Sequence, residues 1–200
     1  MSLTRRGVLA AGAAAGMVSP ALATQAPVMA PAPSRDLLRR ALAALDRHSA
    51  QITHRDLIAV ADFSQASRLP RFHLVETATG RISSHLVAHG RGSDPGHTGW
   101  LERFCNDQGS NASCAGAFRT DDYYVGAHGR SIRLSGLDGT NSNALARGIV
   151  VHGAWYVSPK MVAEHGVLGR SEGCFAFAEN DLPEVLSRLG PGRLLLAGKF

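Results

Sequence analysis

The chain has 200 residues, of which 44% are apolar, and a formal net charge of +5. This length suits one domain with a full-sized core, and the 22 glycines indicate a globular protein with many turns rather than a disordered chain. The lysines and arginines form no basic run interleaved with aromatic residues, so the positive charge does not indicate nucleic-acid binding.

An export signal is predicted at residues 1–23. Arg5 and Arg6 precede an apolar stretch of small residues, and Ala21-Leu22-Ala23 matches a cleavage site. The segment also resembles a twin-arginine signal, which leaves the Tat and Sec routes both open. The alternative is an uncleaved membrane anchor, which the short stretch rich in Ala and Gly disfavours. We therefore expect a periplasmic protein with no stable membrane insertion after cleavage.

A Pro/Ala-rich linker is predicted at residues 24–33, followed by an amphipathic helix at residues 34–49. Ser34 is the expected N-cap of this helix. Apolar residues recur at helical spacing and predict one buried stripe, formed by Leu37, Leu38, Ala41, Leu42 and Leu45.

Beyond the helix the hydrophobic pattern is typical of strands and hairpins. Residues 90–115 form a long polar loop, and loops of this length are usually functional. A short helix is predicted at residues 179–189. The predicted strands are 56–64, 71–77, 81–90, 117–126, 131–137, 147–157 and 193–198. Residues 34–200 are therefore expected to form a single mainly-β catalytic domain with mixed sheets.

Two segments carry candidate chemistry. The apolar run 147–151 ends in His152-Gly153, which places an imidazole at the end of a strand. Cys174 follows Ser171 and Gly173 in a turn, which could point backbone N–H groups at a developing oxyanion. A thiol with a pKa of about 8.5 is only slightly ionised at pH 7, and a neighbouring imidazolium would stabilise its thiolate. Together they predict a cysteine nucleophile and its base.

The cysteine count supports this assignment. Disulfides use cysteines in pairs, so an exported protein with three cysteines keeps at least one free thiol. Cys105 and Cys114 enclose a short loop and could form a disulfide, which would leave Cys174 free. The alternative is that all three are reduced core residues.

These motifs together resemble the L,D-transpeptidase catalytic domain, or YkuD fold, from about Asp56 to the C-terminus. The similarity is greatest to the branch described as murein L,D-transpeptidase catalytic domain-like. The matching stretches are Val87-Ala88-His89-Gly90, Gly136-Leu137, Asn141-Ser142-Asn143-Ala144, Arg147 to Ser158 and Gly169 to Cys174. The resemblance implies a YkuD-like mixed β-sandwich with an N-terminal helix and a short helix after the cysteine.

The resemblance also implies a reaction. Cys174 would attack a diaminopimelate carbonyl in a peptidoglycan stem peptide, with His152 transferring the proton and a thioester as intermediate. An amine of a second stem would then form the cross-link, whereas water would give a carboxypeptidase product. No metal or organic cofactor is implied, and β-lactams of the carbapenem type are expected to acylate the same cysteine.

The sequence departs from the usual family pattern beside the nucleophile. Glu172 replaces the usual His, and the usual Arg shortly after the cysteine is absent. Arg170 or Arg147 could bind substrate carboxylates instead, although Arg147 could equally be structural. Glu172 is either an exposed turn residue or a group that orients substrate amines.

Weaker candidates for substrate binding are Asn141, Asn143, His89 and Tyr124. The asparagines could equally form only a turn, and Tyr124 could serve packing. His85, His89 and His97 have no CxxC or HExxH frame around them, which disfavours a zinc site.

Three rival functions remain open. An L,D-carboxypeptidase or an amidase would use the same dyad with water as acceptor. A non-catalytic wall-binding module would have a structural Cys174. Papain-like and NlpC/P60-like peptidases are disfavoured because their cysteine precedes their histidine, whereas here His152 precedes Cys174.

Overall fold

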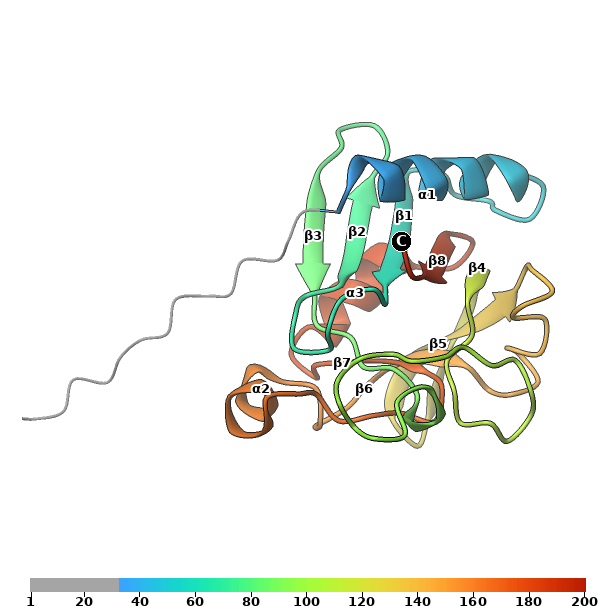
Figure 1. The fold of residues 1–200 in the computed structure, drawn as a ribbon. Coiled ribbons are helices and arrows are strands. Elements are labelled where there is room, and N and C mark those ends of the chain that lie inside the picture. The colour runs from blue at the N-terminus through green and yellow to red at the C-terminus, as the bar shows by residue number, and fades with distance from the viewer. Residues whose placement is uncertain (1–32) are drawn as a thin grey trace, which may run out of the picture.

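The computed structural model describes residues 33–200, which form a mainly-β fold with three α-helices (Figure 1). The predicted export signal at 1–23 lies outside the described residues, as does all of the predicted linker except Pro33. Among the helices of residues 33–200, none has the length and apolarity of a membrane span.

Eight strands form one mixed sheet in the order β3-β2-β1-β8-β4-β5-β6-β7. The pairs β1–β8 and β6–β7 are parallel and the other pairs are antiparallel. The strands are β1 (Leu57–Asp62), β2 (Phe72–Glu76), β3 (Ile82–His85), β4 (Gly116–Gly126), β5 (Gly129–Gly136), β6 (Val150–Gly153), β7 (Phe175–Phe177) and β8 (Leu194–Gly198).

The sheet curls so that its two ends share one core. Phe72 lies in the second strand of the order and Phe177 in the last, yet their ring centroids are 4.7 Å apart. The main core also contains apolar residues of β1, β4, β5, β6, β8 and the helix α3 (Leu182–Leu189). The expected sandwich is therefore made by a single curled sheet, whose β1–β3 and β5–β7 portions lie above and below each other in Figure 1.

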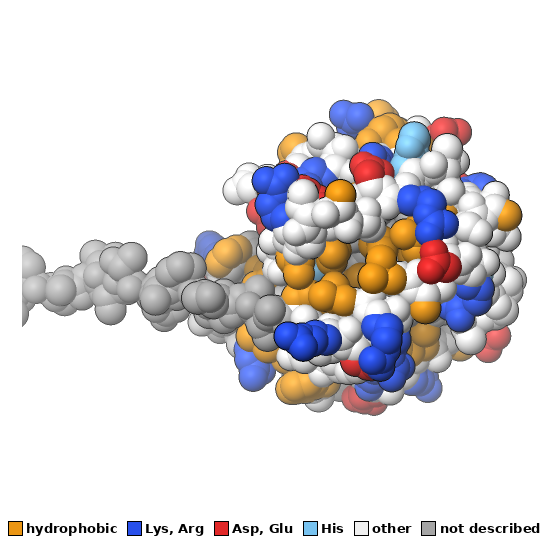
Figure 2. Space-filling view, turned by 90° about the horizontal axis from the view of Figure 1, so that it is seen from above, with side chains coloured by type: hydrophobic (Ala, Val, Ile, Leu, Met, Phe, Trp, Pro, Cys, Tyr) orange, Lys and Arg blue, Asp and Glu red, His pale blue; other side chains and the backbone are white. Residues whose placement is uncertain are grey.

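Helix α1 (Arg35–Arg47) confirms the predicted N-terminal helix. The Ser34 hydroxyl accepts a hydrogen bond from the N–H of Leu37, as expected of an N-cap. Its buried stripe packs on β1 and β8 and consists of Leu37, Ala41, Ala44 and Leu45. The prediction was wrong for Leu42, which is 49% exposed, because the stripe turns toward Ala44. On this side of the molecule, basic side chains are scattered between apolar and acidic ones (Figure 2).

Helix α2 (Pro159–His165) was not predicted, although α3 was. None of its residues is buried, so it carries no apolar stripe that a periodicity analysis could detect. Its end signals are present, because Ser158 caps it, Pro159 begins it and Gly166 ends it in the left-handed conformation.

The long loop after β3 lies beside the segment that carries the cysteine. Its start makes two isolated β-bridges, Ala88 with Ala176 and Gly90 with Ser171. A 3₁₀ turn follows at Arg91–Ser93, and the rest of the loop reaches β4 without a further strand. The predicted strand 81–90 therefore ends early at His85, and its remainder supports the cysteine segment.

Candidate active site

Strands β6 and β7 position the two predicted catalytic residues. His152 is the third residue of β6, which is shorter than the predicted strand 147–157, and it pairs with Ala176 of β7. Cys174 immediately precedes β7 and is partly exposed. Cys174 lies two residues before Ala176, the partner of His152, so the alternation of side chains along a strand places the Cys174 and His152 side chains on the same face of the sheet.

Cys174 and His152 line one cavity of about 570 Å³. Seven of the predicted site residues meet there, namely Tyr124, Arg147, His152, Arg170, Ser171, Glu172 and Cys174. The other lining residues are Arg91, Gln108, Gly109, Asn111, His128, Gly148, Val150 and Tyr156. About half of the residues that line this cavity were thus among the predicted site residues.

The surroundings of Cys174 favour a neutral thiol. Its Sγ donates a hydrogen bond to the carbonyl oxygen of Gly148 at 3.5 Å. Burial raises the pKa of the Cys174 thiol, while the backbone N–H of Val150 and the charge of Arg147 act in the opposite direction. Glu172 adds a further upward contribution to this pKa. The thiol is therefore protonated at neutral pH until a base removes its proton.

The surroundings of His152 favour a neutral imidazole. Burial lowers the pKa of His152, and the nearby His128 lowers it further. The Nδ1 of His152 lies 2.9 Å from the carbonyl oxygen of Gly153. A carbonyl only accepts, so Nδ1 carries the proton and Nε2 has the free lone pair. In place of the expected imidazolium–thiolate pair, a neutral imidazole and a neutral thiol line the same cavity.

Ser171 and Gly173 build the turn before Cys174. The Gly173 N–H donates to Ser171 Oγ at 3.2 Å, and the same hydroxyl donates to the Cys174 carbonyl at 2.7 Å. Gly173 has φ +119°, a conformation that favours glycine. Of the backbone N–H groups of this turn, that of Gly173 is thus already bonded to Ser171, which leaves the N–H of Cys174 as the candidate oxyanion donor.

Ser113, which the sequence analysis missed, joins the long loop to this turn. Its buried hydroxyl accepts from the Gly90 N–H at 3.0 Å and donates to the Gly173 carbonyl at 3.2 Å. A Cβ atom on Gly90 would come within 2.7 Å of Gly173 Cα. The two glycines therefore allow the loop and the turn to lie in direct backbone contact.

Arg147 holds the far side of the long loop. Its Nη1 donates to the Cys105 carbonyl at 2.7 Å and lies 3.2 Å from Cys114 Sγ, and its Nη2 donates to the Ala112 carbonyl. Of the two roles considered for Arg147, these contacts favour the structural one. The guanidinium still lies close enough to Cys174 to lower the pKa of that thiol.

The possible disulfide between Cys105 and Cys114 is not formed, and all three cysteines are free thiols in the structure, as in the alternative considered. Cys114 is buried with Arg147 against its sulfur, and the Cys105 thiol is directed to the Asp107 carboxylate at 3.5 Å. The cysteine count therefore does not single out Cys174. What distinguishes Cys174 is its place in the cavity that also contains His152.

Arg170 and Glu172 differ in their freedom to meet a ligand. The Arg170 guanidinium donates to the backbone carbonyls of Asp94 and Pro95, so it anchors the long loop. Glu172 is 70% exposed and forms a 2.8 Å ion pair with Arg91, which is 56% exposed. The basic group available at the mouth of the cavity is thus Arg91, which the sequence analysis did not identify.

Three weaker candidates lie outside the cavity. Asn141 is buried and closes a turn through its bonds to the Asp138 N–H and the Ala117 carbonyl. Asn143 pairs with the backbone and side chain of Asn106. His89 is buried between Arg71 and Asp94. All three stabilise the fold, and the turn-only alternative holds for both asparagines.

The three histidines considered for zinc have separate partners. His89 bonds Arg71 and Asp94, His97 Nε2 lies 2.8 Å from the Leu168 carbonyl, and His85 Nδ1 lies 3.8 Å from an Asp181 carboxylate oxygen. Each imidazole is thus held by a different part of the fold.

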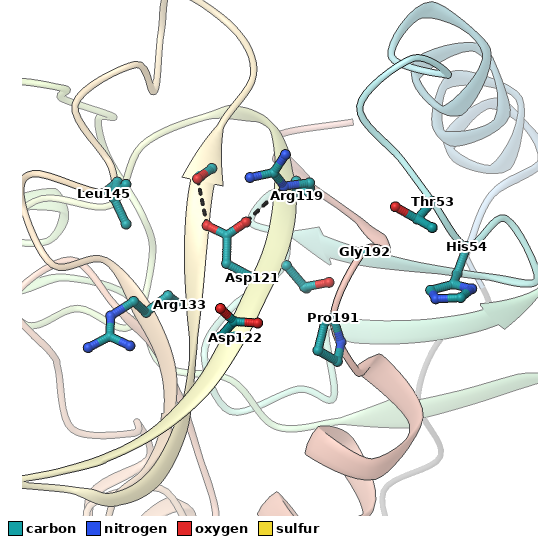
Figure 3. Close-up of a pocket in the computed structure, with 11 residues that line it drawn as sticks. Thr53, His54, Arg119, Asp121, Asp122, Arg133, Leu145, Pro191 and Gly192 are labelled. Carbon is teal, nitrogen blue, oxygen red and sulfur yellow. Dashed lines mark hydrogen bonds and ion pairs between the residues drawn. The ribbon is translucent and has the colours of Figure 1, made fainter.

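A second cavity, of about 530 Å³, lies over β4 and β5 (Figure 3). Its Asp121 carboxylate bonds to Arg119 and to the Ser135 hydroxyl. Asp122 and Arg133 also line it. None of its lining residues is a thiol, so the cavity with Cys174 is the better candidate for nucleophilic chemistry.

Tyr124 and Tyr156 form part of the aromatic wall of the cavity that contains Cys174. The Arg133 guanidinium stacks on the Tyr124 ring at 4.1 Å, which fixes its orientation. Burial, together with the nearby Cys174 and Glu172, raises the pKa of Tyr156 to about 12. Trp155 is 74% exposed, and the ring that stacks on His152 is that of His128.

The chain is similar to proteins of one known family. The family model described as L,D-transpeptidase catalytic domain matches residues 30–197. A search of curated proteins finds no match. Similar solved structures include an L,D-transpeptidase from Mycobacterium smegmatis (13% identity, TM-score 0.44, covering 72% of this chain and 58% of that one). Another is an L,D-transpeptidase from Mycobacterium tuberculosis H37Rv (14% identity, TM-score 0.46, covering 72% of this chain and 58% of that one). This chain thus spans less than two thirds of their length.

Proposed function

Since the chain belongs to the L,D-transpeptidase catalytic domain family, we propose that it cross-links peptidoglycan stem peptides through a thioester on Cys174. The observation that carries the proposal is the shared cavity of Cys174 and His152, with the Nε2 lone pair of His152 free to take a proton.

In the first half-reaction, the Cys174 thiol leaves the Gly148 carbonyl and passes its proton to Nε2 of His152. Sγ attacks the carbonyl carbon of the diaminopimelate residue in the donor stem. The N–H of Cys174 faces the resulting oxyanion, with the charge of Arg147 nearby. The C–N bond then breaks, and His152 returns the proton to the departing D-amino acid. A thioester remains on Cys174.

In the second half-reaction, an amine of the acceptor stem attacks the thioester carbonyl. His152 takes a proton from that amine, the C–S bond breaks, and the proton returns to the Cys174 thiolate. The net result is the exchange of one peptide bond for another, without an external energy source. Water in place of the amine would give the carboxypeptidase product.

Arg91 and Glu172 are the proposed recognition groups for the donor. The free end of diaminopimelate carries one carboxylate and one ammonium group, which match the two charges of this pair. An exposed ion pair contributes only about 0–1 kcal/mol, so a ligand can open it at small cost. Arg91 therefore takes the role that the sequence analysis gave to Arg170 or Arg147.

The periplasm is the proposed location, on the basis of the export signal predicted at residues 1–23. As the family resemblance implies, we also expect a carbapenem to acylate Cys174.

The test is the reaction of purified disaccharide-tetrapeptide with wild type and with Cys174→Ala, followed by mass spectrometry. Wild type should release the terminal D-amino acid and form a cross-linked dimer, and Cys174→Ala should form neither while keeping its circular-dichroism spectrum. Cys105→Ser is the matched control, because it removes a thiol that does not line the cavity. A tripeptide as the only product would identify a carboxypeptidase, and wall binding without any product would identify a binding module.

A further inference from the structure

The tip of the β4–β5 hairpin brings a second imidazole to the catalytic site. His128 lies in the two-residue turn between these strands and lines the cavity of Cys174. Its ring stacks on the ring of His152, with centroids 4.2 Å apart and an angle of 22° between the planes. His152 itself is only 2% exposed, so the exposed His128 ring forms part of its cover.

The position of His128 follows from strand register. Gly126 pairs with Gly129 across the turn, and Gly129 has φ +72°, which lets the chain reverse within two residues. On its other edge β5 pairs with β6, with Ile132 opposite Val151. The next residues along these strands run toward His152, so the hairpin tip overhangs that ring.

We propose that His128 is a positioning residue of this site, whose ring holds the plane of His152 by stacking and shields it from water. The proposal rests on the function proposed above, because it gives His128 a purpose only if His152 is the base. His128 acts through His152 rather than on the reacting atoms.

The charge of His128 adds to this role. The charge interaction with the stacked His128 ring lowers the pKa of His152, in addition to the effect of burial. The other titratable or charged groups around the cavity are Glu172, Cys174, Tyr124, Tyr156, Arg91, Arg147 and Arg170. Glu172 is paired with Arg91, and Arg147 and Arg170 are bonded to loop carbonyls. His128 is therefore the group that faces the ring plane of His152.

The test combines two variants. His128→Phe keeps a flat ring for stacking and removes the charge, whereas His128→Ala removes both. The rate at which a carbapenem acylates Cys174 is measured from the loss of β-lactam absorbance. This rate should fall about 10-fold to 100-fold in His128→Ala and much less in His128→Phe. The pKa of His152, followed by NMR and assigned with His152→Gln, should be lowest in wild type and highest in His128→Ala.

Val125→Ala is the control, because Val125 lies at the same hairpin tip and is 82% exposed. It should leave the acylation rate and the His152 pKa at their wild-type values. If His128→Ala reacts at the wild-type rate with an unchanged His152 pKa, the positioning role is overturned while the proposed function stands. If wild type itself is neither acylated nor able to cross-link, the proposed function fails, and the role of His128 in it falls for that separate reason.

Discussion

Gly173 packs directly against Ala112: a Cβ atom on Gly173 would lie 2.7 Å from the Ala112 carbonyl oxygen, which also accepts a hydrogen bond from Arg147. The turn before the nucleophile and the long loop are therefore in contact through backbone atoms, which cannot move aside as a flexible side chain can. The shape of the turn depends on the absence of a side chain at this position.

The first prediction concerns this contact. Gly173→Ala should slow carbapenem acylation of Cys174 at least about 100-fold, because the added methyl group displaces the turn that aims the thiol. Strain at φ +119° should also lower the free energy of unfolding by about 1–3 kcal/mol. Urea unfolding and the acylation rate measure the two effects. Gly80→Ala is the control, since Gly80 has φ +70° but nothing within 4 Å of the added atom. Equal acylation rates for the two variants would contradict the prediction.

The second prediction separates the charge of Arg147 from its shape. Arg147→Lys keeps the positive charge but cannot make the bonds to Cys105, Ala112 and Cys114 at once. It should lower the free energy of unfolding by about 1–3 kcal/mol, since buried acceptors lose their donor. Arg147→Gln should in addition raise the pKa of Cys174, because the charge that stabilises the thiolate is lost.

Iodoacetamide alkylation of Cys174 as a function of pH, in a Cys105→Ser/Cys114→Ala background, measures that pKa. Arg39→Gln, on the exposed side of α1, is the control and should change neither stability nor alkylation. An Arg147→Gln profile that superimposes on that of Arg147→Lys would show that the charge does not reach the thiol.

The sequence predicted best what depends on local pattern. Helical spacing and a capping serine sufficed for α1. The glycine turn and the strand end singled out Cys174 and His152, which line one cavity. It predicted less well what depends on register between distant strands. His128 reaches His152 only because β5 pairs with β6 in one particular register, which no local pattern reveals.

The same reason explains the errors about arginines and cysteines. Arg91 enters the site through a bridge between Gly90 and Ser171, two segments that lie far apart in the chain. The spacing of Cys105 and Cys114 allows a disulfide, but the guanidinium of Arg147, more than thirty residues away, lies against the sulfur of Cys114. Residue spacing shows which contacts are possible, whereas tertiary packing decides which of them form.

The third prediction tests Arg91 and Glu172 against groups of the substrate. Arg91→Gln should raise KM for the tetrapeptide about 10-fold, which corresponds to about 1.4 kcal/mol of lost binding. With a donor whose free diaminopimelate carboxylate is amidated, the same variant should lose nothing further, because the partner of Arg91 is already absent. Glu172→Gln should behave in the same way toward a donor with an acetylated free amine.

Arg103→Gln is the control, because Arg103 bonds the Gly92 carbonyl in the same loop but does not line the cavity. It should leave KM for all three donors at the wild-type values. Losses in Arg91→Gln that are equal for the native and the amidated donor would refute the contact with the carboxylate.

The fourth prediction concerns the buried chain of Arg71, His89 and Asp94, each at most 1% exposed. The Arg71 guanidinium only donates, so the Nδ1 of His89, 2.7 Å away, accepts and its Nε2 carries the proton toward Asp94. Burial, and next the charge of Arg71, lower the pKa of His89 to about 3. In the unfolded chain this pKa returns to its ordinary value of about 6.5.

Between pH 6.5 and 3 the unfolded chain therefore binds one more proton at His89 than the folded protein does, and stability falls as the pH falls. For one proton the free energy of unfolding changes by at most about 1.4 kcal/mol per pH unit.

His89→Gln should keep both hydrogen bonds without titrating, because its amide can accept from Arg71 and donate to Asp94. Urea unfolding at intervals from pH 7.5 to pH 4 should show near wild-type stability at pH 7.5 and a flatter decline below pH 6.5. His165→Gln, an exposed substitution at the end of α2, should follow the wild-type curve. If His89→Gln followed it too, His89 would not be the group that takes up the proton on unfolding.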